Sequence, residues 1–299
     1  MSRRARFLCL CTIALLPSVC FAKPVFVSNV AGDDRANGLF PDIRTAVDGP
    51  VATLGRALQV ARGGDVIIVA NTGIPYHESV QVDRPELASS DRPLAASEAF
   101  VYRHQSYKVD DQTLGEYPLV IDGQGAVLRG TRRLPAEVWQ RVGADTYRYQ
   151  PYRKGHYQVV VDGALASEVP PDRTQTAPPQ LEPLQWCAVR GFVYFRVEPR
   201  RYVNQYEIEA PAFDIGLGLH NARNVVVRNL TIEQFRLDGI HVSGNCRNVR
   251  LENVRSTGNG RCGLTVTGTS QVQASALDLA GNRVAERQVL VKGRVVDGQ

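Results

Sequence analysis

The last third of the chain repeats itself at an interval of 24 residues. The segment Asn224–Leu230 aligns with Asn248–Val254, and Gly239–Val242 aligns with Gly263–Val266. A weaker third copy begins at Gln271, 23 residues after its counterpart. Repeats of this length are typical of solenoids, in which each copy buries its apolar face against its neighbours. The repeat therefore constrains the fold more than any other feature of the sequence.

The pattern inside each copy favours strands. Leucine-rich repeats share the period, but they need a Leu-x-x-Leu-x-Leu frame followed by a helix, and neither is present. Each copy instead holds short alternating segments divided by Gly and Asn. Alternation directs Ile240 and Val242 inward and His241 outward. This is the pattern of one coil of a parallel β-helix.

Stacking of the coils makes the register explicit. Strands of successive coils would lie about 4.8 Å apart, so each side chain packs on its own copy. We expect Val225 beside Val249. We also expect Asn229 beside Asn253, where the two amides would form a ladder that satisfies polar groups at a corner.

The N-terminus has the features of an export signal. Three arginines precede an apolar run from Phe7 to about Leu16, and small residues stand at Cys20 and Ala22. We expect a signal peptide over residues 1–22 and a secreted or periplasmic protein with no membrane span after its removal. The mature chain keeps three cysteines, Cys187, Cys246 and Cys262, an odd count that predicts at least one free thiol.

The remaining chain divides by composition. Residues 23–129 hold a polar Gly/Asp/Asn loop, a short helix that Thr53 can cap, and apolar strands such as Val66–Val69. Residues 130–210 bring aromatics and prolines and predict an antiparallel β-rich insertion, and residues 211–299 hold the repeats. The net charge of +5 is dispersed, which argues against nucleic acid as a partner.

These features resemble the secreted right-handed β-helix proteins of the pectate-lyase-like superfamily. The resemblance rests on the stretch Val25–Val69 and on the coil Asn224–Ile232 followed by Asp238-Gly239-Ile240. It implies a right-handed solenoid, a helix that caps the open end, and action on polysaccharides along an outward-facing sheet. Its motifs are core and turn positions, so they indicate the fold far more than the activity.

One polar cluster carries the candidate chemistry. Asp238 and His241 are the candidate catalytic residues, and the stacked coils should bring arginines beside them. We expect the substrate-binding residues to be Arg236, Arg261, Glu233 and His220. An aspartate, a histidine and arginines on one surface suit the binding and deprotonation of an acidic sugar. The alternative is that Asp238 shapes a turn and His241 is a solvated outward residue.

Other motifs have simpler readings. The loop Gly32–Gly38 suits either a calcium ligand set or an ordinary turn, so Ca²⁺ is the one cofactor considered, and no other metal site is expected. Gly258-x-Gly260-x-x-Gly263 matches a dinucleotide fingerprint but precedes a strand, which makes it a coil turn. The aromatic side chains of the insertion suit its own core or a wall that grips sugar: Trp139, Tyr147, Tyr149, Tyr152, Tyr157 and Trp186.

The sequence thus predicts a carbohydrate-active protein, a polysaccharide lyase or a glycoside hydrolase that acts on acidic polysaccharide. The alternative is a non-catalytic envelope or surface protein that binds glycan or protein through the solenoid face. The sequence does not choose the linkage, the metal or the oligomeric state.

Overall fold

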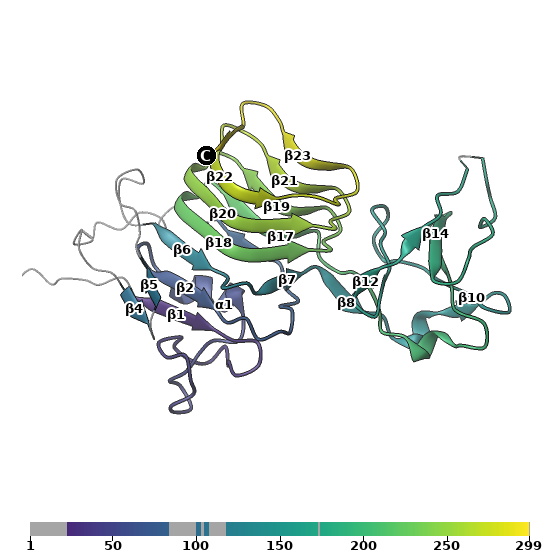
Figure 1. Ribbon diagram of the computed structural model, residues 1–299, viewed down its shortest axis with the longest axis horizontal. Coiled ribbons are helices and arrows are strands. Elements are labelled where there is room, and N and C mark those ends of the chain that lie inside the picture. Colours follow the sequence, from purple (N-terminus) through teal and green to yellow (C-terminus); the bar gives the residue numbers. More distant parts are fainter. Residues whose placement is uncertain (1–22, 84–99, 103–104, 108–117, 173, 299) are drawn as a thin grey trace, which may run out of the picture.

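The computed structural model describes residues 23–83, 100–102, 105–107, 118–172 and 174–298 (Figure 1). This part of the chain is mostly β, with one α-helix and two short 3-10 helices, Ala136–Val138 and Val203–Gln205. The expectation of an all-β protein is confirmed at this level. The expected signal peptide, 1–22, lies outside the described residues.

Two parallel sheets form the larger part of the molecule. The first sheet runs in the order β1-β2-β6-β18-β20-β22-β24, with β7 also paired to β18. Its strands are β1 (Pro24–Val27), β2 (Val66–Val69), β6 (Leu119–Asp122), β7 (Val127–Arg129), β18 (Arg223–Glu233), β20 (Arg247–Thr257), β22 (Gln271–Asp278) and β24 (Arg294–Asp297). The second sheet runs β3-β17-β19-β21-β23. Its strands are β3 (Val80–Val82), β17 (Ile215–His220), β19 (Asp238–Ser243), β21 (Cys262–Val266) and β23 (Ala285–Val289).

From β17 onward the chain alternates strictly between the two sheets, and each strand pairs with the strand one repeat away. The predicted register is confirmed: Val225 pairs with Val249, and Ile240 pairs with Leu264. The third copy follows with Val249 beside Val272. Residues far apart in the sequence are therefore lateral neighbours in space.

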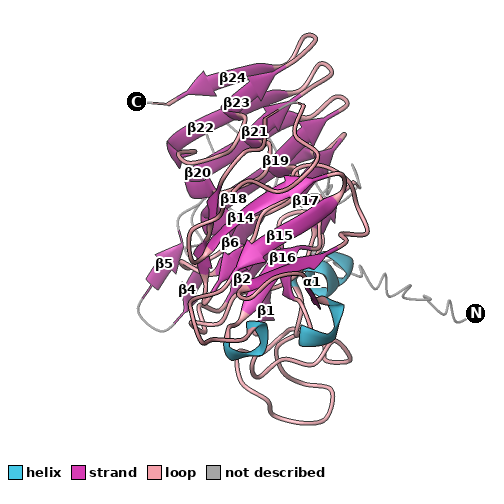
Figure 2. Cartoon of the chain, turned by 90° about the vertical axis from the view of Figure 1, so that its right-hand side faces the viewer, coloured by secondary structure: helices cyan, strands magenta, loops and turns pink. Residues whose placement is uncertain are grey.

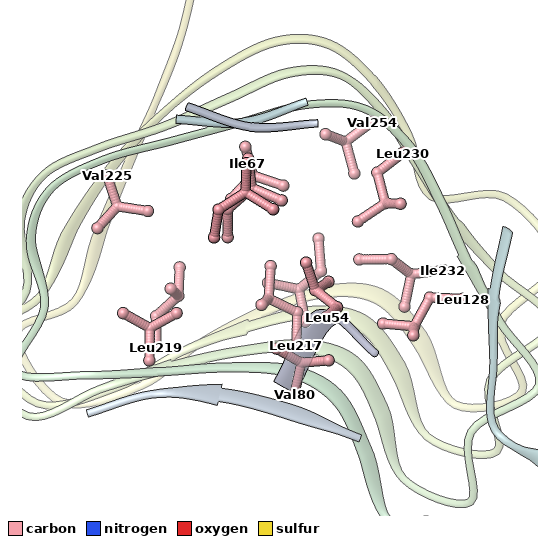
Figure 3. Close-up of a cluster of buried hydrophobic side chains, with 14 of the residues drawn as sticks. Leu54, Ile67, Val80, Leu128, Leu217, Leu219, Val225, Leu230, Ile232 and Val254 are labelled. Carbon is pink, nitrogen blue, oxygen red and sulfur yellow. The ribbon is translucent and has the colours of Figure 1, made fainter. Parts of the chain in front are cut away.

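The core lies between the two parallel sheets. Side chains from both point into one interior, with Ile67 and Val225 on one side and Leu217 and Leu219 on the other (Figure 3). All four are fully buried. Successive repeats place aliphatic side chains in the same row, as Val225, Val249 and Val272 do, so burial of apolar area is repeated from strand to strand. The row of Ile240 and Leu264 ends at Arg287.

The asparagine ladder is confirmed, and it has a backbone cause. Asn229 and Asn253 have φ angles of +53° and +51°, a left-handed conformation that Asn tolerates better than most residues. The Nδ2 group of Asn253 donates to Oδ1 of Asn229 at 2.8 Å, and Asn229 in turn donates to Asp122 at 3.1 Å. The ladder bends β18 and β20 at the same point in each repeat.

The α-helix α1 (Leu54–Val60) lies against the first strands of both parallel sheets (Figure 2). Thr53 caps it by accepting a hydrogen bond from the Arg56 amide at 3.0 Å. Leu54, Ala57 and Leu58 enter the core. The helix ends at Val60, because the next residue, Ala61, has extended backbone angles.

Antiparallel strands occupy the region between β7 and β17 and lie to the side of the parallel sheets (Figure 1). One antiparallel sheet has the strand order β12-β11-β16-β8. Its strands are β8 (Thr131–Arg133), β11 (Val160–Val161), β12 (Ala164–Leu165) and β16 (Ile208–Pro211). The other is β13-β14-β15-β10-β9: β9 (Gln140–Arg141), β10 (Thr146–Tyr149), β13 (Ser167–Glu168), β14 (Gln185–Val189) and β15 (Phe192–Arg196). Within the second, only the short β13 pairs in parallel. A separate hairpin joins β4 (Phe100–Tyr102) to β5 (Gln105–Tyr107).

Ion pairs of Arg153 with Asp214 and of Glu168 with Arg283 join the antiparallel region to the parallel sheets. Further contacts come from the segment 154–158. This segment runs past the turns that precede β19, β21 and β23. It is held by hydrogen bonds from Arg236 to the Lys154 carbonyl (3.2 Å), between His156 Nδ1 and the Gly260 carbonyl (2.8 Å), from Gln158 to the Gly258 carbonyl (2.8 Å) and from Arg283 to the Tyr157 carbonyl (2.9 Å). The two regions therefore meet at the turns that lead into the second parallel sheet.

Candidate active site

The first strand residue after one of these turns is Asp238, at the start of β19. Its position is fixed by the next residue, Gly239, where an added Cβ would lie 1.9 Å from Ser256 Oγ and 2.6 Å from Asn259 Nδ2. The close approach leaves room only for glycine. The Asp238 amide also donates to the Asp214 carbonyl of the preceding repeat at 3.2 Å.

The Asp238 carboxylate is fully buried and joins two other predicted residues. Arg261, at the turn before β21, donates from Nε to Oδ1 at 2.7 Å and from Nη2 to Oδ2. His241, on β19, lies with Nδ1 2.8 Å from Oδ2. A carboxylate can only accept, so Nδ1 carries the proton and Nε2 of the neutral ring is left as the basic nitrogen. We call Asp238, His241 and Arg261 the site triad.

Electrostatics keep this carboxylate ionised. Desolvation is the largest influence and raises the pKa of Asp238, but the hydrogen bonds from Arg261 and His241 together outweigh it, so the pKa lies below its ordinary value. The same pairing raises the pKa of Arg261. The imidazole and the guanidinium remain partly exposed, at 23% and 32% of their side chains, while Asp238 lies beneath them.

A thiol next to the site triad is inert. Cys262 follows Arg261 and is buried, and desolvation raises the pKa of its thiol. A protonated thiol is a poor nucleophile. Cys187 and Cys246 are also buried and free, so the prediction of a free thiol is confirmed.

The other three predicted residues have different partners. Arg236 binds Asp214 at 2.6 Å, and Arg153 of the antiparallel region binds the same oxygen at 2.5 Å. The hydrogen bond from Arg236, helped by the bond from Arg153, lowers the pKa of Asp214, although desolvation acts in the opposite direction. Backbone hydrogen bonds do bring the two turns together, with the Arg261 amide on the Leu237 carbonyl at 2.8 Å. Their arginine side chains nevertheless bind different carboxylates.

Glu233 and His220 stand apart from the site triad. Glu233 accepts two hydrogen bonds from Arg129 on β7, at 2.9 and 2.6 Å. His220 is exposed and lies 3.0 Å from Ser243 Oγ. In the strand register Gly218, not His220, lies beside His241, which places His220 two residues further along β17. The structure thus joins three of the six predicted residues.

Sequence reasoning missed Asp214, Arg153 and His156. Asp214 lies 24 residues before Asp238, so the repeat period itself contained the signal. Arg153 and His156 belong to the antiparallel region, and no spacing in the sequence connects them with the repeats. Only the docking of residues 154–158 brings them to these turns.

The aromatic residues of the antiparallel region mostly form its core. Trp139, Tyr147, Tyr149 and Trp186 are buried in one cluster with Phe195, and Tyr157 packs against it. The core interpretation is confirmed for these five. Tyr152 differs, because its side chain is 99% exposed.

The acidic side chains of the polar loop at 32–38 bind groups of the chain itself. Asp33 binds Arg35, and Asp34 accepts hydrogen bonds from the amides of Ala52 and Thr53 at 2.9 Å. Across the described residues no group of three or more His, Cys, Asp and Glu side chains has a geometry suited to a metal ion. A search of the same residues finds no helix long and apolar enough to cross a membrane.

No protein-family model and no curated protein matches this chain. Among solved structures, one described as "Glycoside hydrolase" is similar over 89% of this chain and 67% of its own, with a TM-score of 0.55 and 12% identity. Another, described as "The complex structure of XylC with xylose", covers 92% of this chain and 70% of its own, with a TM-score of 0.42 and 12% identity. At such identity a likeness concerns the fold alone, and the first shows that this chain shares the general fold of a glycoside hydrolase structure.

Proposed function

We propose that this chain is an exported, carbohydrate-active protein with a right-handed parallel β-helix of the pectate-lyase-like type. The alternation of strands between two parallel sheets and the register at one repeat support that architecture. In this proposal, residues 1–22 are a signal peptide, 23–129 and 211–299 build the solenoid with its capping helix, and 130–210 form the insertion. The partner is an acidic polysaccharide.

The observation that carries the function is the hydrogen bond between His241 Nδ1 and Asp238. It fixes the ring on the outer side of a parallel sheet with its basic Nε2 turned away from the buried carboxylate. An aspartate that fixes the tautomer of a histidine is a recurrent way to prepare a general base. Because Asp238 is buried and its oxygens are already bonded, it is a positioning residue, and His241 is the catalytic one.

Elimination at a uronate fits these groups. His241 Nε2 removes the proton on the carbon beside the sugar carboxylate, and the electron pair forms a carbon–carbon double bond. The glycosidic oxygen leaves and takes a proton from water. Arg261, about one third exposed, offers its positive charge to the substrate carboxylate as charge develops there.

Hydrolysis fits less well. It requires two carboxyl groups, about 5 Å apart for retention or roughly 6.5–9.5 Å apart for inversion. One of the two must be a protonated acid, but Asp238 is bonded to Arg261 and His241 and Asp214 to two arginines, and these partners lower the pKa of both carboxyl groups. We therefore place elimination ahead of hydrolysis.

The test is turnover of a panel of uronate polymers, with ultraviolet absorbance reporting unsaturated products and a reducing-end assay reporting every cleavage. We expect both signals, and a loss of about 10²–10⁴-fold in His241→Ala, the range of a general base. His220→Ala is the matched histidine variant, and we expect it to lose less than about tenfold, because His220 lies outside the site triad.

Each other outcome contradicts a definite part of the proposal. Reducing ends without ultraviolet absorbance would replace the lyase by a hydrolase. Binding of the polymer without turnover would favour the non-catalytic surface protein. Turnover that His241→Ala leaves intact would remove the site assignment.

A further inference from the structure

A cavity of about 220 Å³ lies where the antiparallel region meets the turn before β19. Its wall includes Arg132, Arg133, Arg153 and Arg236, together with Tyr152 and Gln158. We propose that this cavity is a second site, which binds the acidic unit of a saccharide. The site does not require that His241 be catalytic.

The charges around the cavity are unbalanced. Arg153 and Arg236 share one carboxylate, that of Asp214. Arg133 lies 3.8 Å from Glu207 in a well-exposed pair, which contributes little. Arg132 packs over the Phe213 ring at 4.8 Å, and no carboxylate of the described residues forms an ion pair with it. Glu209 also lies opposite Arg133 in the strand register. Four guanidinium groups thus have three carboxylates near them, Asp214, Glu207 and Glu209, and the surplus of one positive charge favours an anion.

The guanidinium groups are also held in place. Arg236 is anchored from both sides, by Asp214 and by the Lys154 carbonyl, and its side chain is only 16% exposed. Arg153 is fixed by the same carboxylate from the antiparallel side. A planar guanidinium already oriented can bind a carboxylate through two hydrogen bonds with little loss of freedom.

Two neutral groups on the wall suit the rest of a sugar ring. The Tyr152 ring is 99% exposed, and an exposed ring beside a cavity offers a surface on which the apolar face of a sugar can stack. Gln158 is buried, and its Oε1 has no hydrogen-bond partner among the described residues. A bound hydroxyl would satisfy that oxygen after a small rotation of the side chain.

Size and position favour one unit of a chain. The cavity is smaller than the roughly 300–1,000 Å³ typical for a drug-sized ligand, so it suits a single ring. Arg236 precedes Asp238 by two residues, and His156, on the cavity wall, binds the carbonyl of Gly260, next to Arg261. A polymer held in the cavity would therefore continue towards the site triad.

The test is calorimetric titration of the full mature chain with three probes: trigalacturonate, the neutral galactose trimer and inorganic sulfate. We expect trigalacturonate to bind, with an affinity that falls as salt is added, and the neutral trimer not to bind. Arg132→Ala should weaken binding roughly tenfold, the loss of one charge-assisted hydrogen bond. Tyr152→Ala should weaken the trisaccharide about fivefold and leave sulfate unchanged, because sulfate has no face to stack.

Arg223→Ala is the control, because Arg223 is exposed on β18 and is not on the cavity wall. His241→Ala should retain binding even if it abolishes turnover, which separates this inference from the proposed function. Equal binding of the acidic and neutral trimers would overturn it. So would trigalacturonate binding that neither Arg132→Ala nor Tyr152→Ala changes.

Discussion

The parallel sheets and the antiparallel region build their cores by different means. Between the parallel sheets the core is aliphatic, and each side chain lies beside its own copy, as Ile240 does beside Leu264. In the antiparallel region large aromatic rings share the core with aliphatic side chains such as Val193 and Ile208, and no position is repeated. Trp139 meets the edge of Tyr149 with ring centroids 4.7 Å apart, and Phe195 meets Tyr206 at 6.4 Å.

The two cores differ in how many strands a single side chain holds together. A repeat needs only its two neighbours, so stability is distributed over the buried repeats rather than centred on one of them. The last strands, β23 and β24, are mostly exposed and contribute least. The aromatic core gathers side chains from several strands around a few large rings, so one ring supports many others. A single substitution should therefore do more damage in the antiparallel region.

The strongest test is Phe195→Ala set against Ile240→Ala. Both side chains are fully buried. We expect Phe195→Ala to lower the free energy of unfolding by about 3–5 kcal/mol and Ile240→Ala by about 2–5 kcal/mol, with the larger loss in Phe195→Ala. Hydrogen exchange should show lost protection confined to residues 131–211 in the first variant. Equal loss of protection in both regions would mean that the two cores unfold as one.

Acid titration of Asp238→Asn tests the junction at the second parallel sheet. The folded-state pKa of Asp238 lies below its ordinary value of 3.8, so the folded state binds fewer protons than the unfolded chain. Its contribution is complete above pH 3.8 and is lost as the pH falls through the folded-state pKa. We expect the variant to be less stable by about 1–3 kcal/mol at pH 7.

The difference between wild type and Asp238→Asn should shrink as the pH falls below 3.8, measured as urea unfolding at several pH values. Asp172→Asn is a suitable control, because Asp172 is exposed and no ion pair is found for it among the described residues. A constant difference from pH 7 to pH 2 would show that the carboxylate has no linked protonation.

The smallest expected effect concerns the contact between the two regions. His156→Asn should cost about 1 kcal/mol, because it removes the hydrogen bond to the Gly260 carbonyl at 2.8 Å. His156 has a φ angle of +51°, which Asn tolerates, so the variant isolates the hydrogen bond from backbone strain. Limited proteolysis should cut near residues 154–158 faster, and Tyr152→Ala should not change the rate.

Much of the parallel part could be predicted. Val66–Val69 is a strand with the predicted bounds, Thr53 caps the helix, and the pairs Val225–Val249 and Asn229–Asn253 lie in the predicted register. These predictions were correct for one reason. Local periodicity and the repeat interval indicate which residues are neighbours in space. Within the candidate site, the same repeat interval predicted that Asp238, His241 and Arg261 lie close together.

The partners of the other charged residues could not be predicted from the repeat interval. The repeat places Arg236 and Arg261 on adjacent turns, but it does not say which carboxylate each binds. In the structure Arg236 binds Asp214, which also binds Arg153 from the antiparallel region.

By itself the sequence determined the stacking of strands, because equal apolar residues at a fixed interval can bury themselves only beside their copies. The tertiary structure alone decided which charges pair and where the basic cavity lies. Those depend on contacts such as His156 with Gly260, made across 104 residues, and no local pattern records where a separate core will dock.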